Sequence, residues 1–204
     1  MQGFQINKGT LQMAAPQLGL EIISGPMFSN KTTTLISWLR EDEKLGKLCL
    51  AFKPSMDNRY SEVELSTHGS VKRTYPAIVI AAASEISLHL PTRHADTIGI
   101  DEIQFFQYPR NLMDVCRELV KQGKRVILAG LDLNYLKENF AWTYFTKPND
   151  QITELSAICS ICGAQAQYSL RTSKSESVID VGGPEKYQPV CGTCFSQAQL
   201  LQRR

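Results

Sequence analysis

The chain has 204 residues, a length that suits one domain with a small appendage, and its composition of 43% hydrophobic and 21% charged residues is typical of a soluble globular protein. Its formal net charge of +2 excludes a general attraction to nucleic acid or anionic lipid, and the charges balance along the chain, with 17 basic against 16 acidic residues in 1–150 and 5 against 4 in 151–204. The longest apolar run, residues 77–83, is far shorter than the ~20 residues of a membrane-spanning helix. Residues 1–19 lack the apolar stretch of a secretory signal, so we expect a flexible leader and a cytoplasmic protein.

Apolar segments with the length of buried strands alternate with helical patterns through the first three quarters of the chain. Strands are predicted at residues 20–24, 47–52, 77–83, 97–100 and 125–130, and helices at residues 32–45 and 110–122. Both helical patterns end at a glycine, Gly46 and Gly123, which is a typical helix stop. The alternation favours an α/β fold in which helices cover both faces of a parallel sheet.

A change of pattern near residue 152 predicts a second, smaller module. Paired cysteines, a short alternating run at residues 167–170, a polar stretch at residues 172–177 and the pair Gly182-Gly183 replace the helical periodicity. We therefore expect one domain over residues 20–151 and a compact, loop-rich domain over residues 152–204.

The loop between the first predicted strand and helix matches the phosphate-binding P-loop template at every fixed position but one. It consists of Gly25, Pro26, Met27, Phe28, Ser29, Asn30, Lys31 and Thr32. In this motif backbone N–H groups bind phosphate oxygens, the lysine reaches the outer phosphates and the hydroxyl residue binds Mg²⁺. Asn30 replaces the second glycine, and we expect it to keep the loop shape, because asparagine takes a positive φ more readily than most residues. A chance turn before a helix is the alternative.

Two acidic residues, Asp101 and Glu102, directly follow the predicted strand at 97–100. A carboxylate at the end of a strand next to the P-loop strand is where nucleotide-hydrolysing P-loop proteins hold Mg²⁺. Glu102 is then placed to accept a proton from an attacking hydroxyl. The alternative is a pair of solvated acids at a strand end.

The six cysteines are of two kinds. Cys49 and Cys116 lie in apolar patterns and are predicted to be buried small hydrophobes. The other four form two C-x-x-C pairs separated by 28 residues, a spacing that predicts a closed, structural zinc site made by Cys159, Cys162, Cys191 and Cys194. Disulfides are the alternative, which the absence of a secretory signal disfavours.

Several motifs occur in one order between about Leu20 and Phe195. They are the loop at 25–32, Asp57-Asn58-Arg59-Tyr60, Gly99-Ile100-Asp101-Glu102 with Gln104-Phe105-Phe106, Gly130-Leu131-Asp132, Val181-Gly182-Gly183 with Lys186-Tyr187, and the cysteine quartet. In these motifs the chain resembles the cytosolic-type thymidine kinase family. The resemblance implies a RecA-like P-loop sheet, a zinc-containing lasso domain and a homotetramer. It also implies transfer of the ATP γ-phosphate to the 5′-hydroxyl of thymidine, acceptance of deoxyuridine, feedback inhibition by dTTP, and a role in supplying deoxyribonucleotides for DNA synthesis.

The resemblance further implies roles for individual residues. Glu102 corresponds to the catalytic base, Asp101 and Thr32 serve Mg²⁺, and Lys31 and Arg59 stabilise charge on the transferred group. The residues expected beside the ATP phosphates, in addition to the loop, are Asp57, Asn58, Arg59, Asp101 and Gln104. The residues expected to contact the nucleoside are Tyr135, Val178, Ile179, Asp180, Val181, Gly182 and Tyr187.

Two other readings are open. Asn30 in the P-loop could make the chain a catalytically weak nucleotide-binding relative. Alternatively, the chain could be a P-loop nucleotide-hydrolysing protein whose zinc module binds nucleic acid. Such a module should cluster Lys and Arg on one face, which 5 basic against 4 acidic residues do not supply. We therefore expect ATP and thymidine as partners and no nucleic acid or membrane.

Overall fold

The computed structural model describes residues 19–56, 64–66, 73–89, 94–173 and 180–202. Residues 1–18 of the predicted leader lie outside this part. So do five residues predicted to bind substrate, namely Asp57, Asn58, Arg59, Val178 and Ile179. Within the described residues, no helix combines the length and the apolar character needed to cross a membrane.

A six-stranded parallel sheet forms the larger part of the molecule, in the order β5-β2-β6-β7-β1-β8. Its strands are β1 (Glu21–Ser24), β2 (Cys49–Pro54), β5 (Ile78–Ile80), β6 (Thr97–Ile100), β7 (Arg125–Gly130) and β8 (Gln151–Glu154). The predicted α/β class is confirmed, and β6 and β7 have the predicted bounds. One expectation was wrong, and one strand was not predicted. The strand expected beside the P-loop strand, β6, is separated from β1 by β7, and the short, exposed, polar strand β8 was not foreseen.

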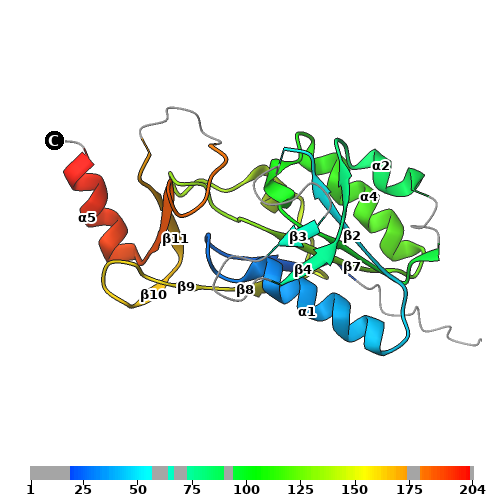
Figure 1. Cartoon of the computed structure of the whole chain (residues 1–204). Helices are drawn as coiled ribbons and strands as arrows, with labels where there is room; N and C mark the ends of the chain where they lie inside the picture. Colours follow the sequence, from blue (N-terminus) through cyan, green and yellow to red (C-terminus); the bar gives the residue numbers. More distant parts are fainter. Residues whose placement is uncertain (1–18, 57–63, 67–72, 90–93, 174–179, 203–204) are drawn as a thin grey trace, which may run out of the picture.

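Helices cover both faces of the sheet (Figure 1). One face carries α1 (Lys31–Lys44) with the hairpin β3 (Glu64–Ser66) and β4 (Thr74–Pro76). The other carries α2 (Ser84–Leu88), α4 (Pro109–Lys121) and the 3₁₀ turn η2 (Ala141–Phe145). Successive side chains of a strand point to opposite faces of the sheet, so they alternate between the cores on the two faces. Thus Ile22 and Leu128 pack on the α4 side, and Ile23 and Ile127 on the α1 side.

The apolar run 77–83 gives only a three-residue strand, β5, followed directly by α2. Glu85 accounts for the early end, because its side chain accepts hydrogen bonds from the backbone N–H groups of Ala81 and Ala82. Both donors belong to the turn between β5 and α2, so this turn competes successfully with a longer strand.

The second module lies at the end of the molecule away from α2 and α4 (Figure 1). It contains the hairpin β9 (Ala157–Ile158) and β10 (Gln165–Ala166), the hairpin β11 (Tyr168–Arg171) and β12 (Tyr187–Val190), and helix α5 (Gly192–Gln202). Its small core gathers around Leu170, Val190 and Phe195 with two of the paired cysteines. The predicted boundary at 151/152 falls inside β8, which pairs with β1, and the division into two domains stays a prediction.

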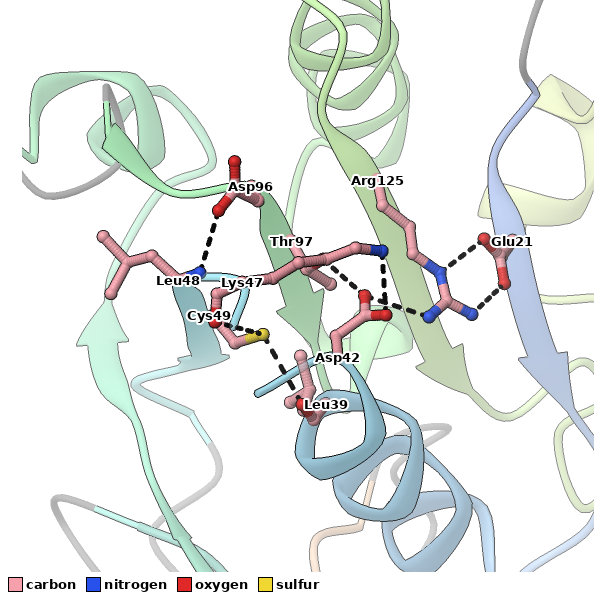
Figure 2. A network of polar contacts seen from close by, with 9 residues as sticks. All are labelled: Glu21, Leu39, Asp42, Lys47, Leu48, Cys49, Asp96, Thr97 and Arg125. Carbon is pink, nitrogen blue, oxygen red and sulfur yellow. Dashed lines mark hydrogen bonds and ion pairs between the residues drawn. The ribbon is translucent and has the colours of Figure 1, made fainter. Parts of the chain in front are cut away.

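A buried polar network holds the end of α1 to the amino ends of three strands (Figure 2). Asp42 accepts hydrogen bonds from Thr97 Oγ1 at 2.5 Å and Lys47 Nζ at 2.9 Å, and it pairs with Arg125 Nη1 at 3.0 Å. Arg125 also binds Glu21 with two nitrogens, at 2.8 and 2.7 Å. The network therefore links α1 to β1, β6 and β7 at the edge of the sheet opposite the P-loop.

The network sets the protonation of Asp42. Burial alone would raise the pKa of this carboxyl, but the hydrogen bonds from Thr97, Lys47 and Arg125 outweigh it and lower the pKa from 3.8 to about 2. Because the pKa is depressed in the folded state, this contribution to stability is present above about pH 4 and is lost as the pH falls toward 2.

We predict that Asp42→Asn will flatten this part of the acid unfolding profile. The wild-type free energy of unfolding should lose up to about 2 kcal/mol through Asp42 between pH 4 and pH 2, and the variant should lack that increment while being less stable at pH 7. Urea unfolding across this pH range measures both effects. Asp114→Asn, at an exposed carboxyl 3.9 Å from Arg110, is the control and should follow the wild-type profile. Equal profiles for Asp42→Asn and wild type would contradict the prediction.

Candidate active site

The loop that joins β1 to α1 holds two non-glycine residues in the left-handed conformation. Asn30 has φ 65° and ψ 26°, as predicted, and its exposed side chain makes no capping hydrogen bond to the helix. Phe28 also has φ 65°. Gly25, at φ 142°, passes so close to the backbone of Leu155 that a Cβ atom would lie 2.3 Å from its carbonyl oxygen. Only glycine fits at this position.

Lys31 and Thr32, the first residues of α1, turn their side chains toward the loop and the end of β6. Lys31 Nζ donates to the carbonyl oxygen of Pro26 at 2.7 Å, and it lies 3.5 Å from Ser29 Oγ. Thr32 Oγ1 donates to Asp101 Oδ2 at 2.8 Å. The phosphate loop and the acidic strand end therefore meet, although β7 lies between their strands.

Both members of the acidic pair are hydrogen-bonded to neighbouring groups. Asp101 is 5% exposed, and its Oδ1 accepts the backbone N–H of Glu102 at 2.9 Å. Glu102 takes the left-handed conformation, with φ 52° and ψ 43°. Gln104 donates its amide to the Glu102 carboxylate and accepts the N–H of Leu131 at 3.0 Å, which ties Glu102 to the end of β7. The close fit requires Gly130, where a Cβ would lie 2.4 Å from the side chain of Ile103.

Backbone strain is concentrated in this region. Of the described non-glycine residues, four have a positive φ, namely Phe28, Asn30, Glu102 and Lys137. The first three lie at the loop or at the acidic strand end. Such conformations cost of the order of 1–3 kcal/mol each and persist where surrounding contacts impose them, most often at active sites.

The second module reaches the phosphate loop through β11. Ser169 Oγ accepts the backbone N–H of Met27 at 2.9 Å in a buried contact, and the guanidinium of Arg171 lies 3.5 Å from the ring centre of Tyr135. The sequence analysis singled out neither Ser169 nor Arg171. The available signal was the alternating run at 167–170, because residues two apart on a strand share a face.

Residues 180–187, which include four of the residues predicted to contact the nucleoside, are joined by hydrogen bonds within the second module. Asp180 pairs with Lys186 and accepts Ser173 Oγ at 3.0 Å, and Lys186 lowers the pKa of its carboxyl. Lys186 also donates to the carbonyl of Val181 at 2.8 Å, and Tyr187 OH donates to the carbonyl of Asp180 at 2.8 Å. Lys186 packs so closely that a Cβ at Gly182 would lie 2.5 Å from it. These contacts hold residues 180–182 against the start of β12.

The four paired cysteines converge, as predicted, on one point. Their sulfur atoms all lie within 4.8 Å of one another, and all four thiols are free. Cys162 and Cys191, one from each pair, have Sγ atoms 3.6 Å apart. Four thiolates around Zn²⁺ with bonds of about 2.3 Å place their sulfurs about 3.8 Å apart, so the donor set and its size fit zinc. No coordination position is open in such a set, which suits a structural ion.

The remaining cysteines, Cys49 and Cys116, are buried as predicted. Cys116 is fully enclosed on α4, and burial raises the pKa of its thiol to about 12. Burial also raises the pKa of Cys49. Both thiols are therefore protonated and unreactive at neutral pH.

Comparison with known proteins gives a consistent match over most of the chain. The family model described as thymidine kinase matches residues 18–195. A protein named thymidine kinase from Rhodothermus sp. is 39% identical over 178 residues, which cover 86% of this chain and 80% of the relative. One from Bacteroides thetaiotaomicron is 36% identical over 181 residues, 88% of each chain. One from Yaba monkey tumor virus is 37% identical over 177 residues, 86% of this chain and 93% of the relative.

We predict that Cys162→Ser will lose the metal and weaken the second module, because in small metal-bound modules the binding energy of the metal is folding energy. Elemental analysis should show about one zinc per wild-type chain and close to none in the variant, with a lower melting temperature. Cys116→Ala, which removes a thiol from the other end of the molecule, is the control and should keep the metal. Purified wild-type protein with no zinc and an unchanged melting temperature would contradict the assignment.

Proposed function

Because the chain belongs to the thymidine kinase family, we propose that it transfers the γ-phosphate of ATP to the 5′-hydroxyl of thymidine. The observation that carries the proposal is the hydrogen bond from Thr32 to Asp101, with Glu102 next in the chain. It joins a phosphate-binding loop to a candidate base within one site. A coupled assay with thymidine and ATP·Mg²⁺ tests it directly, and absence of turnover by the zinc-loaded protein would overturn it.

The loop and α1 are proposed to bind the triphosphate. The backbone N–H groups of residues 25–32 and the amino end of α1 attract phosphate oxygens. Lys31, which now reaches the carbonyl of Pro26, is long enough to turn to the outer phosphates and offset their charge. Asp57, Asn58 and Arg59 are proposed for the same region by resemblance. Thr32 and Asp101 would hold Mg²⁺, which neutralises charge on the transferred group when bound.

Glu102 is proposed as the general base. A carboxylate acts in this role when it is held within hydrogen-bond reach of the attacking hydroxyl. Gln104 positions this carboxylate. Its amide nitrogen donates to Glu102, and its amide oxygen accepts the backbone N–H of Leu131. The left-handed backbone at Glu102 is consistent with a side chain fixed in one direction at a local cost.

The nucleoside is proposed to lie between Tyr135 and the lasso, which includes Val178 to Gly182 and Tyr187. Arg171, packed on the ring of Tyr135, is well placed to hold that ring in position. Deoxyuridine should be accepted, because one methyl group in a pocket is worth only about 1–3 kcal/mol. Inhibition by dTTP is proposed because this nucleotide carries both a thymine and a triphosphate. A homotetramer in the cytoplasm, whose reducing conditions suit thiolate zinc ligands, completes the proposal.

The second reading, a catalytically weak relative, rests on Asn30. Its conformation argues for a working loop, since the backbone takes the left-handed form and the exposed side chain does not occupy the helix end. Phosphate binding by this motif uses main-chain N–H groups, so the loop geometry matters more than the side chain.

We predict that Glu102→Gln will lower kcat by about 10²–10⁴-fold, the usual worth of a general base. ATP binding should persist, because the loop is untouched, and calorimetry with ATP·Mg²⁺ checks this. Glu118→Gln, at an exposed carboxyl on α4, is the matched control and should keep full turnover. Unchanged kcat in Glu102→Gln would remove Glu102 from the mechanism.

We predict that Asn30→Gly will keep the fold and bind ATP at least as tightly as the wild type, because glycine removes a left-handed cost of the order of 1 kcal/mol. Asn30→Val should lose ATP binding and turnover, because a β-branched residue strongly resists a positive φ. ATP affinity and kcat of both variants measure the effect. A glycine variant less active than wild type would show that the asparagine side chain contributes to catalysis.

A further inference from the structure

One residue with a strained backbone, Lys137, lies outside the phosphate loop and the acidic strand end and has no part in the proposed mechanism. It takes the left-handed conformation, with φ 65°. This conformation is unfavourable for any residue that carries a Cβ atom, whereas glycine adopts it freely. Because strain of this kind persists where surrounding contacts impose it, the contacts of the Lys137 side chain should account for it.

The ammonium group of Lys137 lies over two aromatic rings of the second module. Its Nζ atom is 4.1 Å from the ring centre of Tyr168 and 4.2 Å from that of Phe195. The two rings contact each other, with their centres 5.5 Å apart. Both distances from the ammonium group are well inside the ~6 Å range of a cation–π interaction. Lys137 therefore binds its own loop to β11, which carries Tyr168, and to α5, which carries Phe195.

The same loop carries Tyr135, and hydrogen bonds within the loop connect the two residues. Asn134 Oδ1 accepts the backbone N–H groups of Leu136 and Glu138 at 2.9 and 3.0 Å. The carbonyl oxygen of Asn134 accepts the N–H of Lys137 at 3.1 Å. These bonds close one turn in which Tyr135 and Lys137 are two positions apart. A displacement of Lys137 would therefore move Tyr135 as well.

Tyr135 has a second contact with the same strand of the module. The guanidinium of Arg171, on β11, lies 3.5 Å from the ring centre of Tyr135. One cation thus reaches from the loop to the module, and another reaches from the module to the loop. Because the turn contacts the module at two points, it cannot pivot about either one.

From this arrangement we infer that Lys137 is a positioning residue for the nucleoside, because its contact with Tyr168 and Phe195 holds the ring of Tyr135 in place. The inference rests on the proposed function, in which Tyr135 contacts the nucleoside. Without the contact, the turn would have to be ordered each time thymidine binds, which lowers the affinity. The phosphate loop would be unaffected, so Lys137 should set the KM for thymidine and not kcat.

Lys137→Met and Lys137→Arg test this role. Both new side chains are unbranched at Cβ, so both meet the same backbone cost at the positive φ, but only arginine keeps a cation for the two rings. Lys121→Met is the matched control, because it removes the same charge from a 74% exposed position on α4, away from the second module (Figure 1). Equal zinc content and a single cooperative melting transition would show that the variants fold.

The readout is the steady-state kinetics of thymidine phosphorylation together with calorimetric binding of thymidine. Lys137→Met should raise the KM and the Kd for thymidine about threefold to thirtyfold, with kcat and the KM for ATP within about twofold of wild type. Lys137→Arg should bring the KM for thymidine back to within about twofold of wild type. Lys121→Met should match the wild type in every constant.

The role of Lys137 is overturned if Lys137→Met keeps the wild-type KM and Kd for thymidine, or if Lys137→Arg loses as much affinity as Lys137→Met. An equal loss in kcat or in affinity for ATP would also overturn it, because a general structural defect produces that pattern. Normal turnover in the wild type would then leave the proposed function standing. Wild-type protein that neither binds nor phosphorylates thymidine would overturn the proposed function, and this role of Lys137 with it.

The contact itself is tested without any substrate by a double-mutant cycle on thermal stability. Lys137→Met and Tyr168→Leu each remove one partner of the same interaction. The fall in melting temperature of the double variant should therefore be smaller than the sum of the two single falls. Fully additive falls would show that the two side chains do not interact.

Discussion

The candidate site depends on one constraint, the meeting of parallel strands at their carboxyl ends. The hydrogen bond from Thr32 Oγ1 to Asp101 Oδ2 spans this edge and joins the loop after β1 to the end of β6. Gln104 then connects Glu102 to the end of β7. Because three strands contribute to one small volume, their relative positions fix the geometry of the phosphate loop and the acidic pair.

The carboxyl ends of the strands carry strained backbone, whereas the amino ends are joined to α1 by polar contacts. Phe28, Asn30 and Glu102 hold unfavourable backbone conformations at the carboxyl ends of the strands. At the amino ends, Asp42 and Arg125 bind α1 to three strands through buried, charge-assisted hydrogen bonds (Figure 2). The sheet connects the two edges, and strained residues persist only where their surroundings determine them.

The second module contacts the loop at residues 25–32 through β11. Its few apolar side chains form a small core, and a module of this size ordinarily needs a metal ion or disulfides to stay folded. The same strand, β11, carries Leu170 into that core and Ser169 onto the backbone of Met27. The core that surrounds the paired cysteines is thereby connected to the loop at residues 25–32 through adjacent residues of one strand.

Some of this could be predicted from the sequence because the causes are local. The bounds of β6 and β7, the left-handed backbone at Asn30 and the convergence of the four cysteines follow from apolar runs, from the conformational preference of asparagine and from ligand spacing. The tertiary structure alone decided that β7 lies between β1 and β6, that β8 joins the main sheet, and that Ser169 and Arg171 face the loop and Tyr135. These features pair residues separated by up to 142 positions in the chain. Strand order and register are set by burial over the whole sheet, which no local pattern records.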